Sequence, residues 1–381
     1  MSTLRLEPAR VGTLTAREGA GRWYGFDLQL AIYALSLTVI GLLMAFTNSG
    51  GEPLEPGSLF TRGLIWLAFA MVTLVASAAA HHQWLRTFAW PIWVCSIGLL
   101  LATLAVGSGT GGGARWLSVF GLQFQFSEVA KILLAVVLGH YLADRTASLG
   151  SVRTLVGAGL IAAPLMALVL VQPDLGTSLV FVAIVLGALF MSGASLRWLS
   201  VAVLAGLAFL PVAWSLVLRD YQKQRLISFL DPMADPLGSG YQLQQSQIAV
   251  SSGGLFGKGL TNGLTGSQYL PVQSTDFVFA RVGEELGFMG GALVLVLFAL
   301  LIWRVLLVGW RSEDPFTLAF AGGLGGMLLF QMVVNVGMVV GVMPITGIPL
   351  PFVTHGGASL ISAALGLGIL ESLAMRRSRS P

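Results

Sequence analysis

The chain has 381 residues, of which 55% are hydrophobic and only 10% are charged, and its mean hydropathy is +0.83. A soluble domain carries about a quarter charged residues. This composition therefore excludes an ordinary soluble protein and indicates an all-α protein that crosses a membrane many times. Basic residues in such a protein first report topology, so the net charge of +4 is no sign of nucleic-acid binding. The single cysteine, Cys95, excludes an intramolecular disulfide.

Residues 1–22 carry Arg5, Arg10, Arg17 and Arg22 among small polar residues, which predicts a basic cytoplasmic tail. Ten apolar segments follow, each close to the ~20 residues that a helix needs to cross a bilayer. They cover residues 27–46, 60–80, 88–106, 126–143, 154–171, 175–192, 197–217, 280–303, 316–341 and 354–374. We therefore expect one ten-helix membrane domain over residues 23–376 and a short cytoplasmic tail at 377–381.

The distribution of basic residues predicts how these helices are oriented. With the N-terminus in the cytoplasm, most of the 21 basic residues fall in the two tails and in the short loops on that side. This arrangement follows the positive-inside rule and places both termini in the cytoplasm. The long segment 218–279, between helices seven and eight, is then extracytoplasmic. Its glutamine-rich amphipathic stretch, 241–250, is expected to pack back onto the bundle.

Ionisable side chains gather at the starts of three predicted helices that all run inward from the outer face. They are Glu128 and Lys131 at the fourth helix, Asp174 at the sixth, and Asp276, Arg281, Glu284 and Glu285 at the eighth. A charged side chain at membrane depth is costly, about 2.5–3.5 kcal/mol at the bilayer centre on insertion scales. Such groups are expected to pair with one another or to serve a function.

Each of these residues has a structural as well as a functional interpretation. Glu128 and Lys131 are three positions apart on one helix face, as in an ion pair. Asp174 follows a proline and is placed to cap its helix, a role compatible with binding. Arg281 can pair with either glutamate that follows it. Asp276 has no basic residue within four positions on either side, so it is the best candidate for a working carboxylate.

The predicted cluster suits an anionic lipid headgroup at the outer face, because the predicted topology brings Lys131, Lys258 and Arg281 to the same face as the carboxylates. Glycosyl transfer from a lipid-linked diphosphate sugar fits these groups. The acceptor hydroxyl needs a base, and the leaving diphosphate needs neutralisation by cations or by a divalent metal. Proton-coupled transport would use the same residue types. Composition does not decide between the two.

Ordered motifs over almost the whole chain are similar to those of one family. They lie at residues 113–116, 124–131, 172–177, 225–232, 238–242, 253–259, 275–287, 344–352 and 356–357. They resemble the SEDS proteins (shape, elongation, division and sporulation), which include RodA, FtsW and SpoVE. The run 346–352 is more similar to the RodA branch than to the FtsW branch.

The resemblance implies an inverting peptidoglycan glycosyltransferase that polymerises lipid II at the outer face of the bacterial cytoplasmic membrane, for cell elongation and rod shape. The family's essential aspartate falls on Asp276. Substrate-binding roles are then expected at Arg115, Glu128, Lys131, Asp174, Lys258, Arg281, Glu284 and Glu285. The implied partners are lipid II, membrane lipid and a class B penicillin-binding protein. A divalent cation, Mg or Mn, is expected without assigned ligands, and no organic cofactor is expected.

Three departures from the family pattern question how the outer rim contacts substrate. Phe126 stands where the family commonly has proline, Arg115 is a single arginine where two are often adjacent, and residues 354–359 differ from the usual pattern. Three alternatives remain open from the sequence: a lipid-linked precursor flippase, a division-specific polymerase of the FtsW type, and a scaffold that recruits the transpeptidase.

Overall fold

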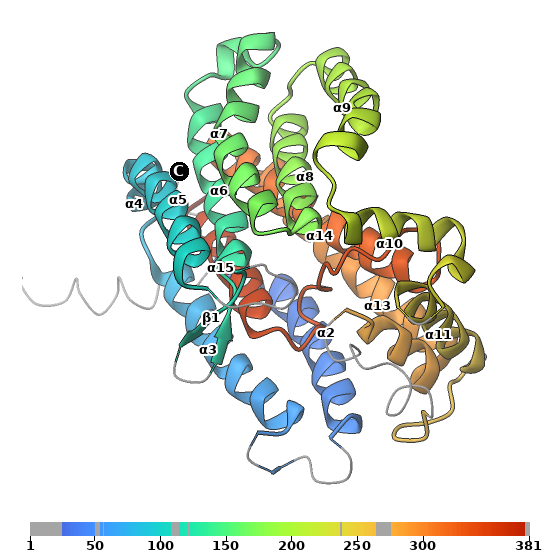
Figure 1. Ribbon diagram of the computed structural model, residues 1–381. Coiled ribbons are helices and arrows are strands. Elements are labelled where there is room, and N and C mark those ends of the chain that lie inside the picture. The colour runs from blue at the N-terminus through green and yellow to red at the C-terminus, as the bar shows by residue number, and fades with distance from the viewer. Residues whose placement is uncertain are drawn as a thin grey trace, which may run out of the picture.

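The computed structural model describes residues 25–49, 54–55, 57–107, 114–119, 122–236, 238–263 and 276–377. Most of them are helical (Figure 1). The long apolar helices are α2 (Leu28–Thr47), α3 (Leu59–Ala79), α5 (Ala89–Val106), α6 (Phe126–Ala143), α7 (Val152–Val171), α8 (Leu175–Met191), α9 (Leu196–Leu216), α13 (Val278–Trp310), α14 (Pro315–Val339) and α15 (Gly357–Arg377). The shorter elements are α4 (His82–Thr87), β1 (Leu117–Val119), β2 (Leu122–Phe124), η2 (Thr146–Ser148), α10 (Asp220–Leu230), η3 (Pro232–Ala234) and α11 (Ser239–Ser252).

Every apolar segment predicted from the sequence is a helix in the structure. Within the described residues, nine helices have the length and apolar character needed to cross a bilayer, and α8 is a shorter apolar helix of 17 residues. The chain is therefore a multi-pass membrane protein. The predicted tail at residues 1–22 lies outside the described part of the chain. The antiparallel pair β1–β2 and the short helix α4 were not predicted.

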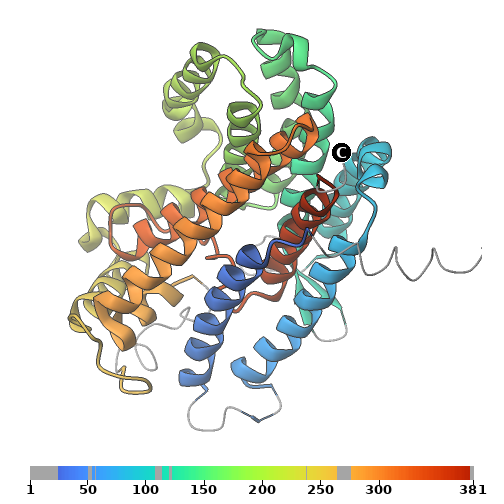
Figure 2. The ribbon, with the colours of Figure 1, turned by 180° about the vertical axis from the view of Figure 1, so that it is seen from behind.

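The helix α14 packs against α6, α8 and α13 and runs antiparallel to all three. On the face seen in Figure 2, α13 packs against α2 as well. Close approaches join late residues of those three helices to early residues of α14: Gly139 with Phe316, Gly187 with Gly322, and Gly309 with Ala321. The starts of α6, α8 and α13 consequently lie at one end of the bundle. The ionisable residues at those three starts are thus brought to the same end.

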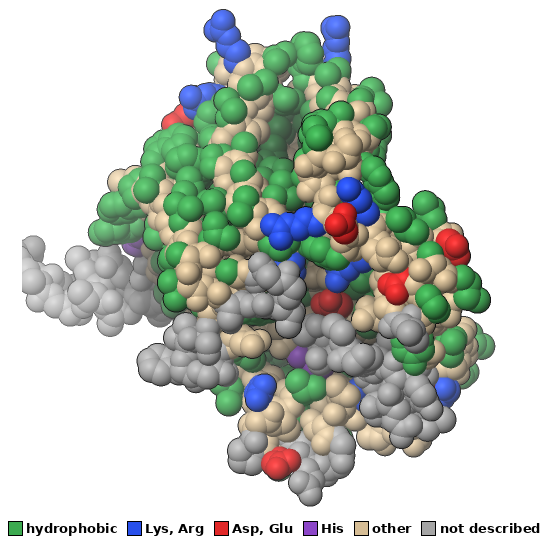
Figure 3. All heavy atoms as spheres, viewed as in Figure 1, with side chains coloured by type: hydrophobic (Ala, Val, Ile, Leu, Met, Phe, Trp, Pro, Cys, Tyr) green, Lys and Arg blue, Asp and Glu red, His purple; other side chains and the backbone are tan. Residues whose placement is uncertain are grey.

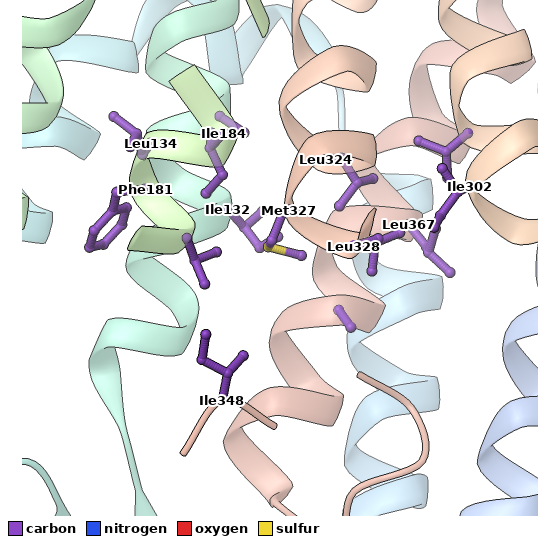
Figure 4. Close-up of a cluster of buried hydrophobic side chains, with 14 of the residues drawn as sticks. Ile132, Leu134, Phe181, Ile184, Ile302, Leu324, Met327, Leu328, Ile348 and Leu367 are labelled. Carbon is purple, nitrogen blue, oxygen red and sulfur yellow. The ribbon is translucent and has the colours of Figure 1, made fainter. Parts of the chain in front are cut away.

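Buried apolar side chains from α6, α8, α13, α14 and α15 meet at the centre of the bundle (Figure 4). Ile132 of α6, Phe181 of α8 and Leu328 of α14 are completely enclosed. Lipid tails are as apolar as these side chains, so close packing rather than the hydrophobic effect holds such helices together. Glycines permit that packing: a Cβ on Gly187 would lie 2.4 Å from the carbonyl oxygen of Gly322.

The segment between α9 and α13 folds back onto the bundle through α10, η3 and α11. The helix α11 covers the predicted amphipathic stretch and packs against α13 and α14. The hydroxyl of Ser246 in α11 donates to the carbonyl oxygen of Val339 in α14 at 3.1 Å. The expectation that this stretch packs onto the membrane helices is therefore confirmed.

The helix α9 stands apart from the bundle, and its only buried residue is Leu199 (Figure 1). A cavity of about 910 Å³ lies between α7, α8 and α9, with walls that are mainly apolar side chains. It ends at α10 and at residues 344–346. The space-filling view shows the molecule hollowed between α8 and α9, with basic and acidic side chains gathered below the hollow (Figure 3).

We expect Gly187→Ala to lower the thermal unfolding temperature of the purified protein by several degrees. The added methyl meets the backbone of α14, and overpacking of this kind costs about 1–3 kcal/mol. Gly98→Ala is the matched control, because a Cβ on this glycine of α5 has no neighbour within 4 Å. That change should leave the unfolding temperature unchanged or raise it slightly. Equal temperatures for the two variants would contradict the packing argument.

Candidate functional site

The helix α13 is broken at Gly287, a feature that the sequence did not reveal. This residue has φ 68° and ψ −165°, a conformation that L-residues rarely adopt and that glycine tolerates. The segment 278–286 is therefore a separate helical piece ahead of the longer membrane helix. It carries the charged residues that open the eighth predicted span.

A loop at residues 253–259 supplies hydrogen bonds to the break. The N–H groups of Lys258 and Gly259 donate to the carbonyl oxygens of Glu284 and Glu285, at 3.0 and 3.1 Å. Just past the break, the N–H groups of residues 288 and 289 donate to the carbonyl oxygens of residues 254 and 255, at 2.8 and 3.1 Å. Broken helices are tolerated at membrane depth when the freed backbone groups find such partners.

Two ion pairs that involve buried glutamates lie at the same break. Lys258 Nζ is 3.0 Å from Glu284 Oε1, and Arg281 Nε is 2.7 Å from Glu285 Oε1. Both glutamates are fully buried, whereas the Lys258 side chain is 30% exposed. The choice that the sequence left open for Arg281 is therefore resolved in favour of Glu285. Removing one partner of a buried pair typically costs about 3–5 kcal/mol, so these pairs constrain the local structure strongly.

A third ion pair opens α6. Lys131 Nζ is 2.7 Å from Glu128 Oε1, and both side chains are almost completely enclosed. The ion pair predicted from their spacing is confirmed. Because the Lys131 side chain is only 1% exposed and its charge is balanced, its contacts here are internal to the bundle.

Asp174 caps α8, as its position after a proline predicted. Its Oδ1 accepts from the Thr177 N–H at 3.0 Å, and its Oδ2 accepts from the Thr177 hydroxyl at 2.9 Å and from Gln125 Nε2 at 3.0 Å. The bond to Gln125 joins the start of α8 to the start of α6. Asp174 also lines the cavity beside α9.

Arg115 lines the same cavity and fastens three segments together. Its Nε donates to the carbonyl oxygen of Gln172 at 2.8 Å, and its Nη2 donates to the carbonyl oxygen of Pro173. Its Nη2 also lies 3.3 Å from the Tyr221 hydroxyl. The segment before β1 is thereby connected to the start of α8 and to α10.

Asp276 is half-buried and lies two residues before α13, next to the N-cap residue Phe277. Its carbonyl oxygen accepts a hydrogen bond from Asn335 Nδ2 at 3.0 Å, and the same amide donates to the carbonyl oxygen of Ile348 at 2.8 Å. Asn335 is fully buried in α14. It therefore fixes the position of the Asp276 turn relative to the segment 344–351. Two amides, Gln331 and Asn335, in an otherwise apolar span were the sequence signal that should have drawn attention to this position.

Arg225 of α10 lies beside Asp276, which the sequence analysis did not predict. A Cβ added to Gly347 would stand 3.5 Å from Asp276 Oδ2 and 3.8 Å from Arg225 Nη1. A small group at that point would thus contact both side chains. Arg225 also lines the end of the apolar cavity. In the sequence Arg225 is one of several basic residues in a long loop, and only the folded structure shows that it lies near Asp276.

The described residues do not provide a metal site. Among them, no three His, Cys, Asp or Glu side chains lie close enough together to hold an ion. Glu128, Glu284 and Glu285 are each bonded to a lysine or an arginine, and Asp174 accepts three hydrogen bonds. The divalent cation expected from the sequence therefore finds no ligand set in this part of the chain.

The arrangement combines a carboxylate with a guanidinium at the end of an apolar cavity. A carboxylate in this position can accept a proton from a hydroxyl group. A neighbouring fixed cation can stabilise negative charge that develops on a phosphate oxygen. The cavity can enclose an apolar chain attached to such a phosphate.

His355 lies just before α15, which begins at Gly357 rather than at the predicted residue 354. Burial and the positive charge of Arg281 lower the pKa of His355 from its ordinary 6.5 to about 4. The folded protein therefore keeps this imidazole neutral at pH values where an unfolded chain would protonate it.

Because the folded pKa of His355 is depressed, its contribution to stability is complete above pH 6.5 and is lost as the pH falls toward 4. We expect the unfolding temperature of the wild type to fall across this window. His355→Gln should flatten that part of the profile, and His81→Gln, at an exposed position, should not. If the unfolding temperatures of all three proteins depended on pH in the same way, His355 would be excluded as the cause of the fall.

A model of the FtsW, RodA and SpoVE family, described as cell cycle protein, matches residues 28–379. The peptidoglycan glycosyltransferase MrdB of Escherichia coli strain K12 is 37% identical over 352 residues, which are 92% of this chain and 94% of that protein. The probable peptidoglycan glycosyltransferase FtsW of Aliivibrio salmonicida is 36% identical over 354 residues, covering 91% and 88%.

Solved structures show the same fold. A chain from work on structural coordination of polymerization and crosslinking by a peptidoglycan synthase complex has a TM-score of 0.80 and 31% identity, over 94% of this chain and 100% of that one. The rod shape determining protein RodA of Thermus thermophilus has a TM-score of 0.70 and 28% identity, over 94% and 99%. The resemblance seen in the sequence motifs is thus confirmed, and the chain belongs to the FtsW, RodA and SpoVE family.

Proposed function

We propose that this protein is a peptidoglycan glycosyltransferase that polymerises lipid II into glycan strands at the outer face of the bacterial cytoplasmic membrane. Relatives named as peptidoglycan glycosyltransferases support the activity. One structural observation carries the proposal. Asp276, positioned through Asn335, lies beside Arg225, and Arg225 lines the end of a large apolar cavity.

The cavity between α7, α8 and α9 suits the isoprenoid chain of a lipid-linked donor. Its volume of about 910 Å³ falls within the ~300–1,000 Å³ typical of ligand sites. Its walls are apolar along the helices, and its polar residues lie near α10 and the start of α8. A lipid with a charged head would place the head at the polar end and the chain between the helices.

The reaction is an inverting displacement at the anomeric carbon of the donor sugar. The acceptor hydroxyl oxygen forms the new glycosidic bond while Asp276 accepts its proton. The bond between the anomeric carbon and the diphosphate oxygen breaks, and the isoprenyl diphosphate leaves with the electron pair. A general base of this kind contributes about 10²–10⁴-fold to the rate.

The remaining charged residues support this chemistry in two ways. Lys258, which is partly exposed, and Arg115, which lines the cavity, are placed to attract the anionic substrate. Lys131 and Arg281 are enclosed in ion pairs with Glu128 and Glu285, so they hold the helices that carry the site.

In the membrane we propose ten spans, with α8 as the shortest and with both termini in the cytoplasm. The segment 218–279 then faces outward, in agreement with the positive-inside count. A related chain comes from a peptidoglycan synthase complex that coordinates polymerization and crosslinking. By analogy, the partner is a class B penicillin-binding protein, and the role is cell elongation. A division role of the FtsW type is the alternative.

Asp276→Asn should leave the protein folded and lower the polymerisation of lipid II by about 100-fold or more, since the amide cannot accept the proton. Glycan length on a gel is the measurement, and the matched control is Asp220→Asn, at an exposed position of α10. Lipid II movement across vesicle bilayers without chain growth by the wild type would instead favour the flippase. Polymerisation that persists in the presence of a chelator would show that the reaction needs no divalent cation.

Asn335→Leu should lower the rate of polymerisation at saturating lipid II by at least about tenfold, while KM changes little. The variant frees Asp276 from its fixed position and leaves two buried carbonyl oxygens unpaired, at about 1–3 kcal/mol each. Gln331→Leu, one turn earlier on α14, is the matched control. Its buried amide has no hydrogen-bond partner among the described residues, so its loss should not reduce activity. Equal activities would rule out the positioning role.

A further inference from the structure

We infer that Arg225, together with the hydroxyl of Thr346, binds the diphosphate of the lipid-linked donor. This assignment rests on the proposed glycosyl transfer and makes the cavity beside α9 the donor side of the site. The sequence alone did not distinguish donor from acceptor, and it pointed to Lys131, Lys258 and Arg281 as the cations for the diphosphate. The contacts of Arg225 are what distinguish it from those three.

Arg225 retains its charge and most of its hydrogen-bond donors for a ligand. Lys131, Lys258 and Arg281 each have a carboxylate oxygen within 3.0 Å. Arg225 has no ion pair within the described chain, and its single hydrogen bond there runs from Nη1 to the carbonyl oxygen of Ile345, at 3.5 Å. A guanidinium has five N–H donors in a planar fork that matches phosphate oxygens.

The position of this guanidinium is fixed by its neighbours. Its carbon Cζ lies over the ring of Tyr221, 5.8 Å from the ring centre. The Tyr221 hydroxyl in turn donates to the carbonyl oxygen of Pro173, ahead of α8. Arg225 is therefore held at the cavity end by a stacked side chain that is itself anchored to the bundle, which reduces the entropy that ligand binding would cost.

Thr346 supplies a second donor from a residue that lines the same end of the cavity. The Thr346 hydroxyl is buried, has no hydrogen-bond partner in the described part of the chain, and belongs to a residue that lines the same cavity. A buried hydroxyl without a partner is costly, so it is expected to be satisfied by a ligand or by water. A phosphate oxygen between Arg225 and Thr346 would satisfy it.

The relation of Arg225 to Asp276 agrees with an inverting displacement. In such a reaction the base and the leaving group lie on opposite faces of the reacting carbon. Asp276 Oδ2 and Arg225 Nη1 come from different elements, and both lie within 4 Å of the position that a Cβ on Gly347 would take. The two groups are therefore close enough to reach one donor sugar, and we assign the carboxylate and the guanidinium to opposite faces of its reacting carbon.

The test measures binding by the full-length protein in nanodiscs to three probes: undecaprenyl diphosphate, uncharged undecaprenol and inorganic diphosphate. We expect Arg225→Gln to weaken the affinity for undecaprenyl diphosphate by about tenfold or more, since a charge-assisted hydrogen bond is lost. The affinity of Arg225→Lys should lie between those of the wild type and Arg225→Gln, because lysine keeps the positive charge but lacks the planar set of N–H donors. Undecaprenol should bind equally to all three proteins, and the wild type should bind inorganic diphosphate more weakly than the lipid.

Lys223→Gln is the matched control, because Lys223 lies two residues away on α10 and does not line the cavity. Equal affinity of Arg225→Gln and Lys223→Gln for undecaprenyl diphosphate would overturn the assignment. The assignment would also be overturned if Arg225→Gln lost affinity for undecaprenol as much as for undecaprenyl diphosphate, since that would indicate a changed cavity shape. Equal affinity of the wild type for inorganic diphosphate and for undecaprenyl diphosphate would overturn it as well.

The variant Asp276→Asn separates this inference from the proposed function. It should bind undecaprenyl diphosphate as the wild type does and yet fail to polymerise lipid II. Polymerisation by Asp276→Asn would exclude Asp276 as the general base. The assignment of Arg225 to the diphosphate would still be decided by the binding measurements.

Discussion

The structure depends on one exchange of backbone hydrogen bonds, between the break in α13 at Gly287 and the loop 253–259. The membrane interior offers no water to satisfy the freed N–H and carbonyl groups, so a broken helix needs another backbone segment as its hydrogen-bond partner. This loop is that partner, and it also brings Lys258 to Glu284. The same contact thus stabilises an irregular backbone and a buried charge at the end of the bundle where Asp276 lies.

Much of the fold was predictable from the sequence because apolar length and local spacing determine it. The ten apolar segments are helices, Asp174 is a cap, and Glu128 pairs with Lys131 three residues on. These features need only a few consecutive residues to be recognised. The break at Gly287 was missed because α13 remains apolar across it, and glycines are common in membrane helices.

The candidate site was only partly predictable, since its contacts join distant parts of the chain. Asp276 was identified from its lack of basic neighbours in sequence, yet the fold brings Arg225 beside it. Asn335 joins residues 276 and 348 through one amide, a role that no local pattern encodes. The cavity depends on how far α9 stands from α8, and hydrophobic periodicity contains no information about that distance.

Gly347 lies next to both charged groups of the site and has a φ of +72°, a conformation that favours glycine. A Cβ on this residue would stand 3.5 Å from Asp276 Oδ2 and 3.8 Å from Arg225 Nη1, which is ordinary van der Waals contact. The backbone conformation, and not a lack of space, is therefore what makes another residue costly here. Truncating side chains to alanine tests what a side chain contributes, whereas the role of such a glycine is tested only by adding atoms to it.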